Sequence, residues 1–168
     1  NDIALAEKLG IKQWVYGPGL PDNAPEIQSK AFDKVDKEIE RFAKGKKAED
    51  LKVKDWNSHQ WLHFIRGLKG LNASKMQDLE ATFAWSTSGN RELQCAWFEH
   101  VIAQKFEAAY KPLEQFLMEV GRRKFLMPLY RGLIDHGQKD WAKKVYQKAR
   151  SGYHAVATES LDPLLLKH

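Results

Sequence analysis

Apolar residues recur every three or four positions over most of the chain, which is the spacing of one face of an α-helix. The first such stretch contains Phe32, Val35, Ile39 and Phe42. Six more follow, with apolar positions at Trp61, Leu62, Ile65 and Leu68; Met76, Leu79 and Phe83; Leu93, Trp97 and Val101; Leu113, Phe116, Leu117 and Val120; Leu129, Leu133 and Ile134; and Trp141, Val145 and Ala149. No stretch alternates apolar and polar residues over the length of a strand, so the pattern predicts an all-α protein.

Polar and turn-forming residues mark the ends of several predicted helices. Candidate N-caps are Asn57 or Ser58 for the second helix, a residue near Ser74 for the third, and Asn90 for the fourth. Gly121 follows the fifth helix, where a glycine suits the left-handed conformation of a C-terminal cap. Pro128 is expected in the first turn of the sixth helix, where its missing N–H leaves no helical hydrogen bond unmade.

Both ends of the chain depart from this helical pattern. Residues 14–26, WVYGPGLPDNAPE, are rich in proline and glycine and predict an extended linker rather than a helix. Residues 154–168, HAVATESLDPLLLKH, predict a turn and a short tail. The helices between them suit either a bundle or a stack of antiparallel helix pairs that curls into a superhelix. The pattern alone does not choose between these two architectures.

The composition limits the class of protein. A chain of 168 residues is long enough to bury the core of one ordinary domain. It contains no run of about eighteen apolar residues, so we expect no membrane span. The single cysteine, Cys95, excludes an internal disulfide and favours a reducing compartment, for which we expect the cytoplasm.

The positive charge is unevenly placed along the chain. The net charge is +5, and residues 121–150 carry nine Lys and Arg against two Asp. Such a segment suits an anionic partner or substrate, or it is the solvated face of the last helices. The total charge is modest, and Asp135 and Asp140 interrupt the cations, so nucleic-acid binding is the less favoured interpretation. We therefore expect no nucleic-acid partner.

Two histidines, His59 and His63, have the four-residue spacing with which zinc peptidases present two ligands on one helix face. The residue after the first histidine is Gln60, which cannot supply the general base of such a site. A third ligand separated from His63 by about eighteen residues, as in one large peptidase class, would fall on Thr82, and Glu80 is out of register. We therefore interpret the pair as ordinary histidines and assign no metal ligand.

The search for nucleophiles and for charged clusters gives one candidate site. Cys95 lies five residues before His100, which on a helix is not a facing pair, so we expect a buried structural cysteine and no catalytic residue. The segment GRRKF, residues 121–125, places three cations directly after a helix end. Arginine offers a planar, two-pronged donor for a carboxylate or phosphate, and lysine adds a point charge.

Three motifs occur in a recognisable order: WVYGPGLP at residues 14–21, SHQ at 58–60, and GRRKFLMPLY at 121–130. Further similarity lies in QKFEAA at 104–109 and YHAVATESL at 153–161. Together they resemble the C-terminal region of leukotriene A(4) hydrolase and aminopeptidase B, which are zinc aminopeptidases of the gluzincin class. The resemblance spans essentially the whole chain. In that family the SHQ stretch lies on a helix of the C-terminal domain, so the resemblance implies that the histidine spacing is a coincidence.

The resemblance implies a fold and a domain organisation. The fold is a two-layer α-α superhelix, similar to armadillo or HEAT repeats, with about eight or nine helices. Residues 1–28 would form an N-terminal segment and a Pro/Gly-rich interdomain linker, and residues 29–168 the helical C-terminal domain. In the family an N-terminal β domain and a catalytic domain, which holds zinc, precede this region. We therefore expect no cofactor in this segment, zinc in the missing catalytic domain, and an inactive isolated segment.

The resemblance also assigns residue roles. In the family, the arginine and lysine of a Gly-Arg-x-Lys-Phe motif reach into the active-site cleft and bind the free carboxylate of the substrate. These residues match Arg122 and Lys124 here, with Arg123 at the variable position and expected to be exposed. The domain would close the substrate cleft of an aminopeptidase that removes N-terminal residues from short peptides. Its partners would be those peptides and the enzyme's own N-terminal and catalytic domains.

The alternative is a helical-repeat interaction module without a catalytic role. Epoxide hydrolysis of a lipid is a specialised activity of the family, on which no residue of this segment bears.

Overall fold

The computed structural model describes residues 2–24 and 30–166. These two ranges contain ten α-helices and four single 3₁₀ turns, and they contain no strand. The all-α prediction is therefore confirmed. Two compact units are present, Asn1–Lys30 and Ala31–His168. The predicted domain boundary between residues 28 and 29 lies outside the described residues and stays a prediction.

The first unit contains two short helices, α1 (Asp2–Lys8) and α2 (Ile11–Tyr16). Gly10 separates them with a left-handed backbone, at φ 66°. The prediction of an extended segment from Trp14 onward is wrong for its first three residues, which belong to α2. The reason is local, because proline and glycine begin only at Gly17, and residues 11–16 contain neither. Residues 17–24 are non-helical, as expected.

The second unit is a stack of helices joined by short loops. Its helices are α3 (Lys30–Ala43), which begins at the unit boundary, α4 (Ser58–Gly67), α5 (Ala73–Phe83), α6 (Arg91–Ala103), α7 (Tyr110–Glu119), α8 (Arg123–Asp135), α9 (Lys139–Ala149) and α10 (Ala155–Leu165). The 3₁₀ turns are η1 (Ala48–Asp50), η2 (Trp85–Thr87), η3 (Glu107–Ala109) and η4 (Arg150–Gly152).

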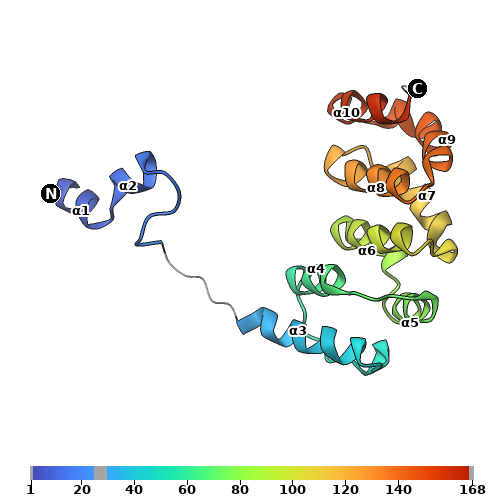
Figure 1. Cartoon of the computed structure of the whole chain (residues 1–168), viewed down its shortest axis with the longest axis horizontal. Helices are drawn as coiled ribbons and strands as arrows, with labels where there is room; N and C mark the ends of the chain where they lie inside the picture. Colours follow the sequence, from blue (N-terminus) through green and yellow to red (C-terminus); the bar gives the residue numbers. More distant parts are fainter. Residues whose placement is uncertain (1, 25–29, 167–168) are drawn as a thin grey trace. The chain divides into compact units, whose positions relative to one another are not determined.

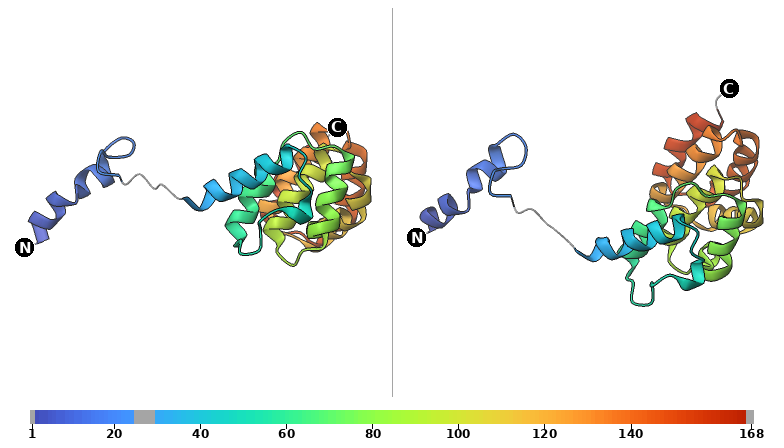
Figure 2. Two further views of the ribbon diagram at one scale, coloured as in Figure 1. Left: turned by 90° about the horizontal axis from the view of Figure 1, so that it is seen from below. Right: turned by 60° about the horizontal axis from the view of Figure 1, so that its bottom comes forward.

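The helices of this unit form two layers (Figure 1). One layer contains α4, α6, α8 and α10, in which α6 packs on α4 and α8, and α8 packs on α10. The other layer contains α5, α7 and α9, in which α7 packs on α9. Figure 2 shows the same stack from two further directions. This is the two-layer helical stack that the family resemblance implied, and the alternative of a bundle, which the sequence pattern left open, is not formed.

Asparagine side chains begin three of the helices. Asn57 accepts hydrogen bonds from the amides of His59 and Gln60, and the Gln60 side chain accepts one from the Asn57 amide, which completes a capping box. Asn90 caps α6, as predicted. The cap of α5 is Asn72, two residues before Ser74, so it lies near the predicted position.

The core between the layers is rich in aromatic rings. Trp85, which is 3% exposed, lies at the centre of a cluster with ring centroids 5.7 Å from Trp61 and 5.1 Å from Trp97. The indole N–H of Trp97 donates to Ser86 Oγ over 3.1 Å, so the buried polar atom has a partner. This cluster joins α4 to η2 and α6, which follow it in the sequence only after the whole of α5.

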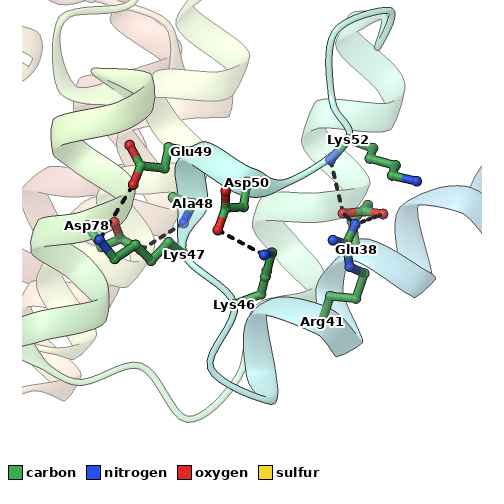
Figure 3. A network of polar contacts seen from close by, with 9 residues as sticks. All are labelled: Glu38, Arg41, Lys46, Lys47, Ala48, Glu49, Asp50, Lys52 and Asp78. Carbon is green, nitrogen blue, oxygen red and sulfur yellow. Dashed lines mark hydrogen bonds and ion pairs between the residues drawn. The ribbon is translucent and has the colours of Figure 1, made fainter.

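A buried carboxylate fixes the loop after α3 (Figure 3). Glu38 is 6% exposed, and both of its carboxylate oxygens accept from Arg41 Nη1. Its Oε2 also accepts the backbone N–H of Lys52 over 3.0 Å. Nearer the start of the loop, Asp78 of α5 accepts the backbone N–H of Ala48 over 2.8 Å. These carboxylates satisfy backbone donors of the 46–52 loop that no strand or helix would satisfy. The loop is therefore held at both ends.

The predicted C-terminal tail is wrong, because residues 155–165 form α10. Ala157, Leu161 and Leu165 recur every four residues and are all buried. Pro163 lies inside the helix and suggests a break when the sequence is considered alone, yet burial of this face stabilises the helix despite the lost hydrogen bond. None of the helices in the described ranges has the length and apolar character needed to cross a membrane.

Two further details of helix ends differ from prediction. Gly121 does not have a left-handed backbone, since it is absent from the residues with positive φ. Pro128 lies in the second turn of α8 rather than the first, because the helix begins at Arg123. Its ring removes the N–H that would reach the carbonyl of Lys124 in a regular helix.

Candidate functional site

The three consecutive cations of the sequence lie on the joint between α7 and α8, which we call the GRRK loop, residues 121–124. After α7 ends, Val120 is extended, and Arg122 occupies the N-cap position of α8 at φ −85° and ψ 124°. Arg123 and Lys124 form the first turn of the helix. Cations at this end of a helix add to the positive end of the helix dipole. The local potential therefore favours an anion.

The backbone of the GRRK loop is packed against the segment before α10. The amide of His154 donates to the carbonyl of Gly121 over 3.3 Å. A Cβ atom at Gly121 would lie 2.9 Å from the carbonyl oxygen of Gly152, which is closer than real Cβ contacts allow. Glycine is therefore required at position 121 because two backbones approach each other there.

Phe125 supports the two cations that the sequence singled out. Its ring is 6% exposed, so it forms a fixed surface under the loop. The guanidinium carbon of Arg122 lies 5.9 Å from the ring centroid, and Lys124 Nζ lies 5.5 Å from it. Both distances fall within the range of a cation–π contact. The two charged groups are thus brought together over one aromatic ring.

The two cations differ in their carboxylate partners. Lys124 Nζ lies 2.5 Å from Glu92 Oε1, which comes from the first turn of α6. Arg122 has no ion pair with any residue in the described ranges, and its side chain is exposed. The charge of Arg122 is therefore available to an anion from outside the chain.

The GRRK loop forms one wall of an open depression of about 690 Å³. The opposite wall is made by residues 151–154 together with Val156 at the start of α10. The His154 ring nitrogen Nδ1 accepts the N–H of Val156 over 3.3 Å, which leaves Nε2 as the nitrogen that carries the hydrogen. Both walls thus present hydrogen-bond donors, a combination that suits an anionic ligand.

Arg123 is exposed, as expected, but it has a structural contact. Its Nε donates to Ser160 Oγ over 2.7 Å, and Ser160 Oγ in turn donates to the carbonyl of Val156 over 2.9 Å. This chain of hydrogen bonds ties the first turn of α8 to α10. Arg123 therefore braces the site and differs in surroundings from its two neighbours.

Tyr153 anchors the second wall of the depression. Its hydroxyl donates to the carbonyl of Leu117 over 2.6 Å and lies 2.8 Å from the hydroxyl of Tyr130. Burial raises the pKa of Tyr153 to about 12, so it remains a neutral donor. Tyr153 and His154 were not predicted as site residues. His154 is the first residue of the stretch interpreted as a turn and tail, and Tyr153 directly precedes it, so only the packing of α10 brings them to the loop.

The histidine pair lies elsewhere. His63 Nε2 is 2.7 Å from Asp36 Oδ1, and its ring stacks on Phe32 with centroids 4.4 Å apart. Glu80, the nearest candidate for a third ligand, accepts a hydrogen bond from Ser86 Oγ over 3.0 Å. Residues 2–24 and 30–166 contain no group of three or more His, Cys, Asp or Glu side chains placed to hold a metal ion. The chemistry of a zinc site does not fit these residues.

Cys95 is buried next to Phe125, the residue that follows the GRRK loop. It is 5% exposed, and its Sγ lies 3.7 Å from the carbonyl oxygen of Phe125. Burial, assisted by the negative charges of Glu99 and Glu92, raises the pKa of the thiol to about 12. A thiol of this kind is not a nucleophile at neutral pH, so the expectation of a buried structural cysteine holds.

The protein is an all-α, two-layer stack of helices. It carries a cationic depression near its C-terminal end. Among solved structures, the native yeast LTA4 hydrolase is similar, with a TM-score of 0.72 and 25% sequence identity. The match covers 92% of this chain and 29% of that chain. The family described as leukotriene A4 hydrolase, C-terminal, matches residues 56–165, and the chain belongs to this family.

Relatives of known name extend the likeness over almost the whole chain. Leucine aminopeptidase 2 of Yarrowia lipolytica is 27% identical over 175 residues, which covers 95% of this chain and 27% of that protein. The leukotriene A-4 hydrolase homolog of Botryotinia fuckeliana is 26% identical over 167 residues, which covers 93% and 25%, respectively. This chain therefore spans about a quarter of the length of these relatives.

Proposed function

We propose that this chain is the C-terminal domain of a zinc-dependent aminopeptidase, and that Arg122 and Lys124 bind the C-terminal carboxylate of a short peptide. The observation that carries this proposal is the placement of both cations over the Phe125 ring at the edge of one depression. Membership of the family and the names of the relatives support the class of enzyme. In this proposal residues 1–28 form the connecting segment, and the domain closes one side of the substrate cleft.

Zinc belongs to the part of the enzyme outside this chain. The metal would polarise the scissile carbonyl and activate water there. The residues of this chain contribute binding and orientation. A peptide held at its carboxylate by Arg122 and Lys124 presents a fixed length of chain to the catalytic domain, which favours short peptides. In the same proposal the enzyme is cytoplasmic, and this domain packs on the N-terminal and catalytic domains of the same enzyme.

Arginine and lysine have complementary roles in such a site. The guanidinium of Arg122 offers two parallel N–H donors to the two oxygens of a carboxylate. The ammonium of Lys124 adds a compact charge whose direction depends on its neighbours. An Arg122→Lys change would keep the charge and lose the paired donors, so it is not conservative here.

The test is Arg122→Ala in the full-length enzyme. A hydrogen bond to a charged group contributes roughly 1.5–3 kcal/mol, so kcat/KM for a tripeptide should fall about tenfold to a hundredfold. The same tripeptide with a C-terminal amide, or a chromogenic amide that lacks a carboxylate, should be affected little. Steady-state kinetics on both substrate types measure the difference.

Arg123→Ala is the matched control, because it removes an equal charge from the same loop. Its contact is Ser160, so the ratio of acid to amide activity should stay as in the wild type. Equal losses on both substrate types in Arg122→Ala would contradict the carboxylate role. They would favour a helical-repeat module that supports the enzyme through protein contacts alone.

A further inference from the structure

Lys124 already holds a carboxylate of its own chain. Glu92 Oε1 lies 2.5 Å from Lys124 Nζ, and the two side chains are 35% and 59% exposed. Glu92 belongs to α6, whereas Lys124 belongs to α8, and these two helices pack directly on each other. A negative group from a neighbouring helix is therefore built into the proposed anion site.

Glu92 is held in place by its own helix. Its amide donates to Asn90 Oδ1 over 3.0 Å, which fixes it in the first turn of α6. A carboxylate is favoured at this end of a helix because it faces the positive end of the dipole. The neighbouring Arg91 does not compete for Glu92, since it donates to Glu119 and Gln94, each over 2.8 Å. Glu92 is thus directed to Lys124.

An incoming peptide carboxylate meets two unequal cations. Arg122 has no carboxylate partner within the described ranges, whereas the charge of Lys124 is offset by Glu92. An ammonium group has three hydrogens, so Lys124 can share a second carboxylate, but the two anions repel each other across it. The ion pair therefore weakens the grip of Lys124 on any carboxylate that enters.

We propose that Glu92 is a positioning residue that acts through Lys124, holding its ammonium group and lowering its affinity for the carboxylate of substrate or product. This inference rests on the proposed function. In this inference the carboxylate of Glu92 competes with the peptide carboxylate for Lys124. It thereby weakens the binding of peptides with a free C-terminus and favours their release.

The test is Glu92→Gln in the full-length enzyme. Glutamine keeps the size and the hydrogen-bond acceptor of the side chain and removes its charge. Exposed ion pairs contribute little, so KM for a free-acid tripeptide should fall by only about two- to fivefold, with kcat unchanged. KM for the same tripeptide as its C-terminal amide should not change. A merely structural role would not produce this split between acid and amide.

Glu119→Gln is the matched control. It removes the same charge from a neighbouring ion pair, in which Glu119 lies 2.8 Å from Arg91. Because Glu119 does not contact Lys124, its loss should leave both KM values unchanged. An equal decrease in KM for Glu92→Gln and Glu119→Gln would indicate a general charge effect and overturn the proposal.

A double-mutant cycle with Lys124→Met locates the effect. In the Lys124→Met background, Glu92→Gln should no longer lower KM for the free acid. Two results would overturn the role of Glu92. One is a decrease in KM for the free acid that persists in the Lys124→Met background, and the other is no decrease in KM when Glu92→Gln is made in the otherwise wild-type enzyme. Loss of acid selectivity in Arg122→Ala tests the proposed function separately. If Arg122→Ala lowers activity on the free acid but not on the amide, while Glu92→Gln leaves KM for the free acid unchanged, the role of Glu92 is rejected and the proposed function stands.

Discussion

Arg122 and Lys124 are separated by one residue, yet their charged partners differ. Both lie over the ring of Phe125, and within residues 2–24 and 30–166 only Lys124 of the two is paired with a carboxylate. The sequence pattern of the loop gives no sign of this difference. Glu92 is thirty-two residues away in the chain, and its contact arises only because α6 packs on α8.

Cys95 gives a prediction about chemical reactivity. Its pKa of about 12 means that the native thiol carries almost no thiolate at pH 8. We expect alkylation by iodoacetamide to be at least about a hundredfold slower in the native chain than in guanidinium chloride. Mass spectrometry of samples quenched over time measures both rates. Similar rates in the two states would show that the thiol is accessible.

The same group has a defined effect on stability. The fold favours the neutral thiol, because its pKa is raised above the value of 9.0 for the free group. The stabilisation is therefore fully present below pH 9 and is lost as the pH rises from about 9 toward 12. Cys95→Ala should remove this part of the alkaline decline in the free energy of unfolding.

At the scale of the helix, the segments from α3 to α9 were predictable because each buries a continuous apolar face. Val35 and Phe42, for example, have the helical spacing and are both almost fully buried. The last helix was not predicted, because Pro163 and a mixture of small and polar residues obscure its buried face. Helix starts were predictable where a side chain caps the backbone, as at Asn90.

The approach of two loops could not be predicted from the sequence. A glycine after a helix is typical of a left-handed cap, so the pattern at Gly121 indicated a local reason for the residue. The actual reason is tertiary, since the backbone of Gly152 occupies the space of a side chain. Periodicity describes single elements and gives no information on which loops meet.

Gly121→Ala tests this close approach. The new methyl group would lie 2.9 Å from the carbonyl oxygen of Gly152, so the two loops must separate. We expect a loss of about 1–3 kcal/mol in the free energy of unfolding, as for other overpacked positions. Gly89→Ala is the control, because no atom lies within 4 Å of the added Cβ and its backbone is not left-handed. Denaturant unfolding of both variants measures the difference, and equal stabilities would contradict the contact.

At the scale of the whole molecule, the hydrophobic core belongs to one of the two units. Every buried apolar residue in the described ranges lies between Val35 and Leu165. Residues 2–24 contain no buried side chain and expose several apolar ones, including Ile3, Val15 and Tyr16. The second unit therefore has a core of its own.

A shortened chain that begins at Lys30 tests this independence. Because the core is complete without the first unit, we expect a change in Tm below about 3 °C, which for a domain of this size corresponds to roughly 1 kcal/mol or less. Calorimetry on the two chains measures the shift. A large decrease in Tm would mean that the first unit stabilises the second.

The dependence of the GRRK loop on Tyr153 and α10 has a consequence for synthesis on the ribosome. The loop is translated before the residues that contact it, so its hydrogen bonds with His154 and Ser160 can form only after those residues have left the exit tunnel. A nonsense codon at position 153 would leave the seven helices from α3 to α9 encoded in full. It would still remove Tyr153, His154 and Val156 from one wall of the cationic depression. The codons after the GRRK loop thus encode one wall of the depression, although the codons of the loop itself encode its cations.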